Sequence, residues 1–160
     1  MFEEQIASDF TQMFPETREG LRTVGREAEY TVVDSNGFAV DIEPLLQKMF
    51  EQYNDYSIVR KDGVKIGIKT TDHQFLKEVG KGTIEVVSRP CGDLWELRSV
   101  HQIAMRRLLS EANKIGYSIL GIGLHPRSTP SWDLLTKKPH YRVLYNLIPE
   151  VWDWFELKIG

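Results

Sequence analysis

Four glutamates in this chain have the chemistry and the spacing that metal binding requires. Glu27 and Glu29 stand two residues apart in a segment that alternates polar and apolar residues, so both side chains leave the same side of a strand, about 7 Å apart. Glu85 lies between two apolar residues and is expected to point away from the core, and Glu78 lies in the preceding strand. Carboxylates from neighbouring strands repel one another unless cations lie between them. Such oxygen ligands suit Mg²⁺ or Mn²⁺, with phosphate oxygens and water completing the shell.

The Glu-x-Glu pattern also has a simpler explanation, which the sequence leaves open. Alternating polar residues are the usual composition of a strand whose outer face meets water. On that interpretation Glu27 and Glu29 are merely solvated, and the domain is purely structural. A metal site requires the fold to bring Glu78 and Glu85 to the same face, so the prediction depends on the elements around them.

These elements are the strands and helices of an α+β domain. We predict strands at 23–34, 56–61, 64–70, 74–79, 83–89 and 117–124. We predict helices at 3–14, 43–53, 94–115 and 140–147, followed by a last segment at 151–159. Strands linked by hairpins favour a mostly antiparallel sheet with helices against its apolar face. The open face is then expected to carry the polar side chains of Glu27, Glu29, Lys65, Lys69 and Glu85.

Two local signals support these elements. Asp62-Gly63, between two alternating segments, is a dipeptide that favours a two-residue hairpin turn. The helix at 94–115 follows Asp93, a candidate N-cap, and Glu96 completes a capping box. The apolar stripe of this helix is expected to consist of Leu94, Leu97, Ala104, Leu108, Ala112 and Ile115.

Composition and charge restrict the class of protein. The 160 residues are 41% hydrophobic and 27% charged, which is sufficient for one packed domain. The net charge of −3 argues against a sequence-independent hold on nucleic acid, which needs a basic face. No apolar stretch approaches the ~20 residues that cross a bilayer, so we expect no membrane partner. A single cysteine, Cys91, indicates a reducing compartment, and we expect a cytoplasmic protein. The sequence leaves a homo-oligomer open.

Three more residues are candidates for ligand binding. His125 precedes Pro126 at a predicted strand end, where it could contact a substrate or cap a backbone carbonyl in a turn. Arg142 could hold a carboxylate or a phosphate with two parallel hydrogen bonds, and a surface ion pair is the alternative. Arg89 flanks the carboxylates, and its alternative role is only to balance their charge.

Several segments of the chain, in order, resemble segments of the glutamate–cysteine ligase family. Residues 24–30 (VGREAEY) look like the opening strand of that family, and residues 82–87 (GTIEVV) are similar to its second glutamate strand. Residues 121–126 (GIGLHP) resemble its Gly-x-His-Pro strand end, and residues 140–142 (HYR) resemble its downstream Arg/Tyr segment. Each motif is loose, and their order and spacing make the resemblance specific.

The resemblance implies a fold and a reaction. Members share the catalytic fold of glutamine synthetase, in which a curved antiparallel sheet holds metals on its open face. ATP phosphorylates the side-chain carboxylate of glutamate, and the amine of cysteine attacks the acyl phosphate. The product is γ-glutamylcysteine, an intermediate of glutathione synthesis. The implied cofactor is Mg²⁺ or Mn²⁺, and the implied small-molecule partners are ATP, glutamate and cysteine.

The resemblance also implies roles for residues of this chain. By position, Glu27, Glu29 and Glu85 match the metal-binding glutamates of the family, and Glu78 matches a fourth acidic position. Tyr141 belongs to the downstream segment and is a candidate for binding substrate or nucleotide, as are His125, Arg142 and Arg89.

The chain departs from the family pattern at two places. Leu124 stands where many relatives have threonine, and Tyr141-Arg142 reverses an Arg-Tyr order. A ligase with another amine acceptor therefore stays open, as does a non-catalytic module that binds metal or nucleotide. The motifs cover only the first part of a family member, and residues 155–159 begin a strand-like alternation. We expect residues 1–160 to be the N-terminal part of a ligase domain, inactive alone, with a natural terminal edge strand as the alternative.

Overall fold

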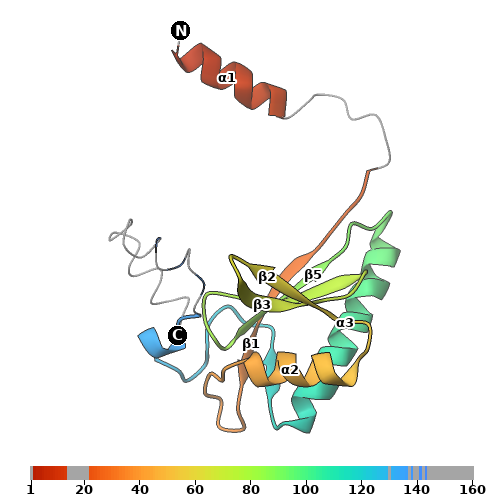
Figure 1. Ribbon diagram of the computed structural model, residues 1–160, viewed down its shortest axis with the longest axis vertical. Helices are drawn as coiled ribbons and strands as arrows, with labels where there is room; N and C mark the ends of the chain where they lie inside the picture. Colours follow the sequence, from red (N-terminus) through yellow and green to blue (C-terminus); the bar gives the residue numbers. More distant parts are fainter. Residues whose placement is uncertain are drawn as a thin grey trace.

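The protein is an α+β domain built on one six-stranded sheet. The computed structural model describes residues 2–13, 22–129, 131–136, 138, 141 and 143. The elements are α1 (Phe2–Met13), β1 (Glu27–Val33), α2 (Glu43–Gln52), β2 (Ser57–Lys61), β3 (Val64–Lys69), β4 (His73–Lys77), β5 (Thr83–Ser88), α3 (Leu94–Lys114), β6 (Ser118–Leu120) and the 3₁₀-helix η1 (Trp132–Leu134). The strand order is β2-β3-β4-β5-β1-β6, and every pair is antiparallel. The predicted α+β class is therefore confirmed (Figure 1).

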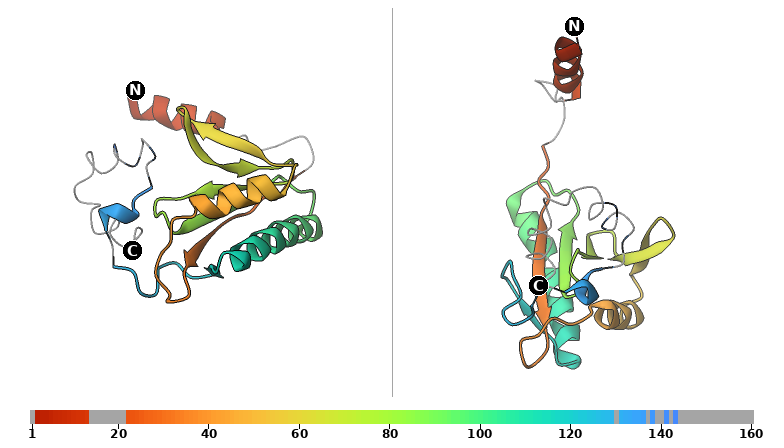
Figure 2. Two further views of the ribbon diagram at one scale, coloured as in Figure 1. Left: turned by 60° about the horizontal axis from the view of Figure 1, so that its bottom comes forward. Right: turned by 90° about the vertical axis from the view of Figure 1, so that its left-hand side faces the viewer.

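The apolar core lies between the sheet and helices α2 and α3, which pack beside each other on one face of it (Figure 2). Alternation along the strands sends one set of side chains into this core. The fully buried members include Val32, Ile68, Phe75, Ile84, Val86, Leu45, Leu46, Met49, Ala104 and Leu108. Burying one large aliphatic or aromatic side chain of this kind contributes about 1.5–3 kcal/mol. The two helices thus fix the sheet from one side and leave its other face free for polar groups.

The hairpin between β2 and β3 has the turn that its sequence predicts. Asp62 and Gly63 both have positive φ, at 51° and 78°, as a type I′ turn requires. The register shifts between Val59 and Arg60, and such a bulge increases strand twist. In this twisted edge hairpin, Lys65 Nζ donates to Glu43 Oε1 of α2 over 2.8 Å. The prediction that Lys65 shares the face of the glutamates is therefore wrong.

Helix α3 begins as predicted, with one change at its cap. The backbone N–H of Glu96 donates to Asp93 Oδ1 over 2.8 Å, which is half of a capping box. The carboxylate of Glu96 accepts instead from the N–H of Gly92 and from Arg89. Leu94 is 69% exposed, so the stripe predicted to face the core is wrong for the first residue of the helix.

The predicted strand at 117–124 is much shorter in the structure. Only Ser118–Leu120 pair with β1, opposite Thr31–Val33, and the following residues 121–124 are exposed. Gly121 and Gly123 lack side chains that could pack on the sheet, and glycine weakens a strand. The predicted segment at 151–159 and most of the helix predicted at 140–147 lie outside the described residues, although Tyr141 and Val143 have helical backbone.

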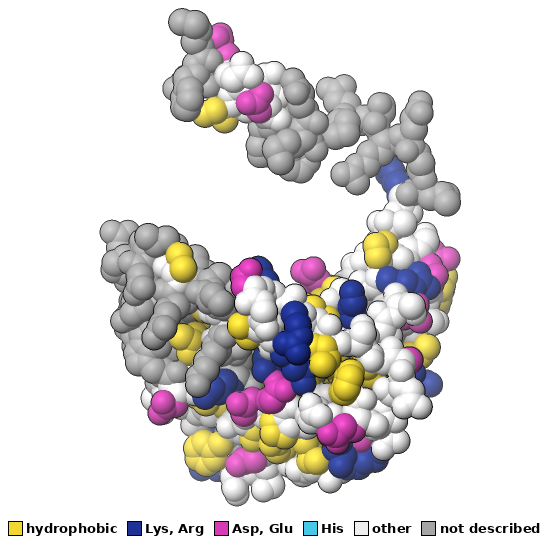
Figure 3. Space-filling model, in the orientation of Figure 1, with side chains coloured by type: hydrophobic (Ala, Val, Ile, Leu, Met, Phe, Trp, Pro, Cys, Tyr) yellow, Lys and Arg dark blue, Asp and Glu magenta, His cyan; other side chains and the backbone are white. Residues whose placement is uncertain are grey.

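Charges of both signs lie close together on one face of the molecule. On the face seen in Figure 3, lysine and arginine side chains lie next to aspartate and glutamate side chains. In the part of the chain that the structure describes, no helix has the length and apolar character needed to cross a membrane.

Candidate functional site

The pairing of β1 with β5 brings the predicted glutamates together. Glu29 lies directly opposite Glu85, and Glu27 lies opposite Val87 on the same side. Directly opposed residues of an antiparallel pair have Cβ atoms about 5 Å apart. The intervening residues of β1, Ala28 and Tyr30, lie opposite core residues of β5. The glutamates therefore occupy the face of the sheet that α2 and α3 leave open; we call this the acidic face, made of Glu27, Glu29, Glu78 and Glu85.

Glu85 is the electrostatic centre of the acidic face. Burial and the negative charges of Glu78, Glu27 and Glu29 raise its pKa to about 7, against an opposing effect of Lys138. A carboxyl with this pKa is half protonated at neutral pH, because a full set of negative charges is unfavourable there. A divalent cation would relieve the same repulsion, so the donor set fits Mg²⁺ or Mn²⁺. Among the described residues, no three His, Cys, Asp or Glu side chains are grouped closely enough to hold an ion alone, so phosphate oxygens and water would have to complete the shell.

Glu78 reaches the acidic face from the end of β4 and has two close partners. Tyr141 Oη donates to Glu78 Oε2 over 2.9 Å, and Lys138 Nζ donates to Glu78 Oε1 over 3.2 Å. Burial, and then the charge of Glu78, raises the pKa of Tyr141. Tyr141 was predicted to bind a ligand, and the structure places it against a predicted metal-binding glutamate. Lys138 was missed, because a lysine beside another lysine and a proline has the sequence character of a solvated loop.

A pocket of about 320 Å³ opens beside Glu29, where β6 leaves the edge of β1. Its lining residues are Arg26, Ala28, Glu29, Tyr30, Thr31, Val79, Thr83, Gly121, Ile122 and Gly123. The carboxylate of Glu29 thus lies beside a small cavity that is lined mainly by small and apolar residues, which suits a small molecule. Sequence reasoning missed this pocket because it extended β6 across the space that the pocket occupies.

His125 lies against the start of β5. A Cβ atom on Gly82 would be 2.7 Å from His125 Cε1 and 2.9 Å from Nε2, so the ring packs where only glycine fits. Burial lowers the pKa of His125, although the backbone of Gly82 opposes this shift. Neither ring nitrogen makes a well-formed hydrogen bond with a described residue. The prediction that His125 contacts substrate stays a prediction.

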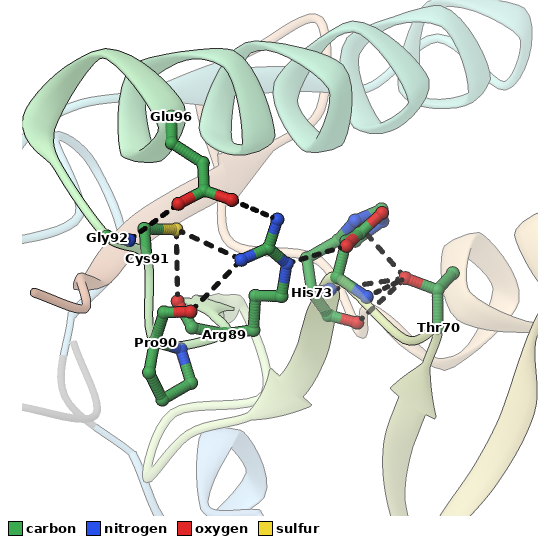
Figure 4. Close-up of polar contacts among 8 residues, drawn as sticks. Thr70, His73, Arg89, Pro90, Cys91, Gly92 and Glu96 are labelled. Atoms are coloured by element: carbon green, nitrogen blue, oxygen red, sulfur yellow. Dashed lines mark hydrogen bonds and ion pairs between the residues drawn. The ribbon is translucent and has the colours of Figure 1, made fainter. Parts of the chain in front are cut away.

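Arg89 lies at the end of β5 and is engaged within the chain (Figure 4). Its Nε donates to Asp72 Oδ1 over 2.8 Å, and its Nη2 donates to Glu96 Oε1 over 2.7 Å. These hydrogen bonds raise the pKa of Arg89 and connect the β3–β4 turn with the start of α3. Both partners lie outside the acidic face, so these contacts do not show the predicted balancing of its charge, and ligand binding by Arg89 stays a prediction. Arg142 lies outside the described residues.

Comparison with known proteins gives the family. No curated protein sequence matched the chain. Residues 23–157 match the family described as Glutamate-cysteine ligase family 2 (GCS2). This match covers most of the chain, and it includes every strand of the sheet and all four glutamates of the acidic face. The chain therefore belongs to glutamate–cysteine ligase family 2, a family of ligase-type enzymes.

Proposed function

We propose that the protein is an ATP- and magnesium-dependent ligase of the cytoplasm that joins the side-chain carboxylate of glutamate to the amine of cysteine. The product would be γ-glutamylcysteine, for glutathione synthesis. The observation that carries the proposal is the direct opposition of Glu29 and Glu85 on the open face of the sheet. The proposal extends to a glutamine-synthetase-like arrangement, in which such a face holds metal and nucleotide.

In this proposal the carboxylates of the acidic face position the metal ions and, through them, the phosphates of ATP. Glu27, Glu29 and Glu85 supply hard oxygen ligands from two neighbouring strands, and Glu78 adds a fourth from the end of β4. These side chains would hold Mg²⁺, which would supply positive charge to the β- and γ-phosphates of ATP. The side-chain carboxylate of the substrate glutamate would then take the γ-phosphoryl group as ADP leaves, and phosphate would leave when the amine attacks the acyl phosphate. Because Glu27, Glu29 and Glu85 come from paired strands rather than from loops, their spacing is held by the hydrogen bonds of the sheet.

The pocket beside Glu29 supports an amino-acid substrate. Glu29 offers an acceptor to the ammonium group of an amino acid at the wall of this pocket. The pocket directly adjoins the acidic face, which is where the phosphorylated carboxylate must meet its amine. Ile122 and the glycines beside it line the same pocket, so the amine acceptor is expected to be selected there.

The test measures phosphate release from ATP by the natural full-length protein, with glutamate and a panel of amines that includes cysteine. Glu29→Gln and Glu85→Gln are expected to lower turnover by at least roughly 100-fold, because amides are poor ligands for a hard dication. Glu51→Gln, on the outer side of α2, is the matched control and should leave turnover unchanged.

The outcomes separate the candidate functions. Turnover with another amine but not with cysteine would assign a different acceptor to the same reaction. ATP binding that requires magnesium but leads to no turnover with any amine would indicate a binding module. Full turnover by Glu29→Gln and Glu85→Gln would exclude the acidic face as the place of reaction.

A further inference from the structure

Three side chains at the rim of the acidic face form a cluster, Glu78–Lys138–Tyr141. Lys138 Nζ is 3.2 Å from Glu78 Oε1 and 3.3 Å from Tyr141 Oη. Tyr141 Oη in turn donates to the second oxygen of Glu78, Oε2, over 2.9 Å. Lys138 and Tyr141 are each only 8% exposed. Both carboxylate oxygens of Glu78 are therefore engaged by groups that have lost most of their contact with water.

The ammonium of Lys138 acts on the whole acidic face. At Glu85, burial and three negative charges oppose ionisation, and Lys138 is the positive group that counters them. A compact ammonium in contact with a carboxylate does part of what a bound cation would do. Lys138 thus gives the face a built-in positive charge before any metal arrives.

We propose that Lys138 is a positioning residue whose ammonium competes with a divalent cation for the carboxylate of Glu78 and thereby sets the affinity of the acidic face for that cation. This inference rests on the proposed function, because only that function gives the carboxylate of Glu78 a dication as an alternative partner to Lys138. When Glu78 binds a dication, the ammonium has to move away, since like charges at short range repel in proportion to their product. Removing the ammonium should therefore strengthen cation binding.

The chain around Lys138 allows this exchange without a change in the sheet. The N–H of Thr136 donates to the carbonyl of Val79 over 2.8 Å, which attaches the segment next to Glu78. The N–H of Tyr141 donates to the carbonyl of Lys138 over 3.2 Å. These backbone contacts stay in place while a flexible lysine side chain turns away, because lysine has a long stem with many rotamers.

The test measures Mn²⁺ binding to the protein at a saturating concentration of a non-hydrolysable ATP analogue, because phosphate oxygens complete the shell. The electron paramagnetic resonance signal gives the free ion, and a titration without protein gives the part bound by the analogue alone. Lys138→Met keeps most of the length of the side chain and removes its charge. It is expected to bind Mn²⁺ roughly tenfold more tightly, as follows from removing one positive charge close to a dication. Lys138→Arg keeps the charge and should retain the wild-type affinity. Lys138→Gln is the second neutral variant, for use if the methionine variant does not fold.

A matched control separates the effect of the contact between Lys138 and Glu78 on Mn²⁺ affinity from the effect of the protein's net charge. Lys65→Met removes the same charge from a lysine that pairs with Glu43 on α2, and it should leave Mn²⁺ affinity unchanged. A residue that only supports the fold would weaken binding when replaced, which is the opposite sign. Unchanged or weaker binding by the neutral Lys138 variants therefore overturns the inference.

The same titration distinguishes failure of the role proposed for Lys138 from failure of the proposed function. If Glu85→Gln weakens Mn²⁺ binding while the Lys138 variants leave it unchanged, the proposed function survives and the role of Lys138 fails. If Glu85→Gln has no effect either, the acidic face is not a cation site, and both proposals fail together.

Discussion

At the scale of single residues, the acidic face is a place of unfavourable charge that folding tolerates. Glu85 lies opposite Glu29, and like charges directly opposed across a strand pair are destabilising. Natural sheets avoid such pairs unless they serve a purpose, and strain of this kind concentrates at functional sites. The raised pKa of Glu85 is the measurable sign of that conflict.

The pH dependence of stability follows from this shift. The folded pKa of about 7 exceeds the ordinary value of 4.5 for a glutamate, so the folded state binds more protons between those values and loses stability as pH rises through them. Glu85→Gln removes the titration. Without metal, we expect this variant to exceed wild type in free energy of unfolding by about 1–2 kcal/mol at pH 8, a figure reduced for solvent screening because Glu85 is only half-buried. Near pH 4.5 the advantage should vanish.

Urea unfolding at both pH values, in the presence of a chelator, measures the difference. Glu51→Gln serves again as the control, since it removes a carboxylate from an exposed helix position. Parallel pH profiles for Glu85→Gln and wild type would show that Glu85 ionises without penalty.

At the scale of elements, the sheet depends on a close approach between β3 and β4. A Cβ atom on Gly67 would lie 2.1 Å from the backbone oxygen of Phe75, and backbone cannot turn away as a side chain can. We expect Gly67→Ala to lower the free energy of unfolding by about 1–3 kcal/mol or more, because the strands would have to separate. Gly121→Ala is the control, since nothing lies within 4 Å of its Cβ position. Equal stability of the two variants in urea unfolding would contradict this account.

Local patterns predicted the elements better than their ends. Alternation and the Asp62-Gly63 turn identified the strands, and the cap at Asp93 identified α3, because these signals act between neighbours in sequence. The end of β6 was predicted too late, because the strand was extended over Gly121 and Gly123, which have no side chains to pack on the sheet. The burial of Lys138 against Glu78 has no local signal, because 60 residues separate the two.

At the scale of the whole molecule, the strand order assembles the site from distant parts of the chain. β1 lies between β5 and β6, so residues 27–33, 83–88 and 118–120 become neighbours only in the folded sheet. The sequence predicted which glutamates face away from the core, because alternation determines the face. It did not predict which residues stand opposite one another, because register depends on the turn and on the packing of the complete sheet.

Because the site exists only in the folded sheet, ligand binding and folding stability are thermodynamically linked. A ligand that binds only the folded protein stabilises it by about 2.7 kcal/mol at 100 times its Kd, and for a domain of this size that raises Tm by several degrees. We therefore expect Mn²⁺ with a non-hydrolysable ATP analogue to raise the Tm of the protein in a thermal melt. Because Glu29 and Glu85 come from two strands, replacing both with glutamine should abolish this rise while leaving the fold intact, as circular dichroism would confirm. If the double variant still shows the wild-type increase in Tm, the nucleotide and metal bind away from the acidic face. Ligands held by Glu29 and Glu85 would no longer raise the Tm once both carboxylates are removed.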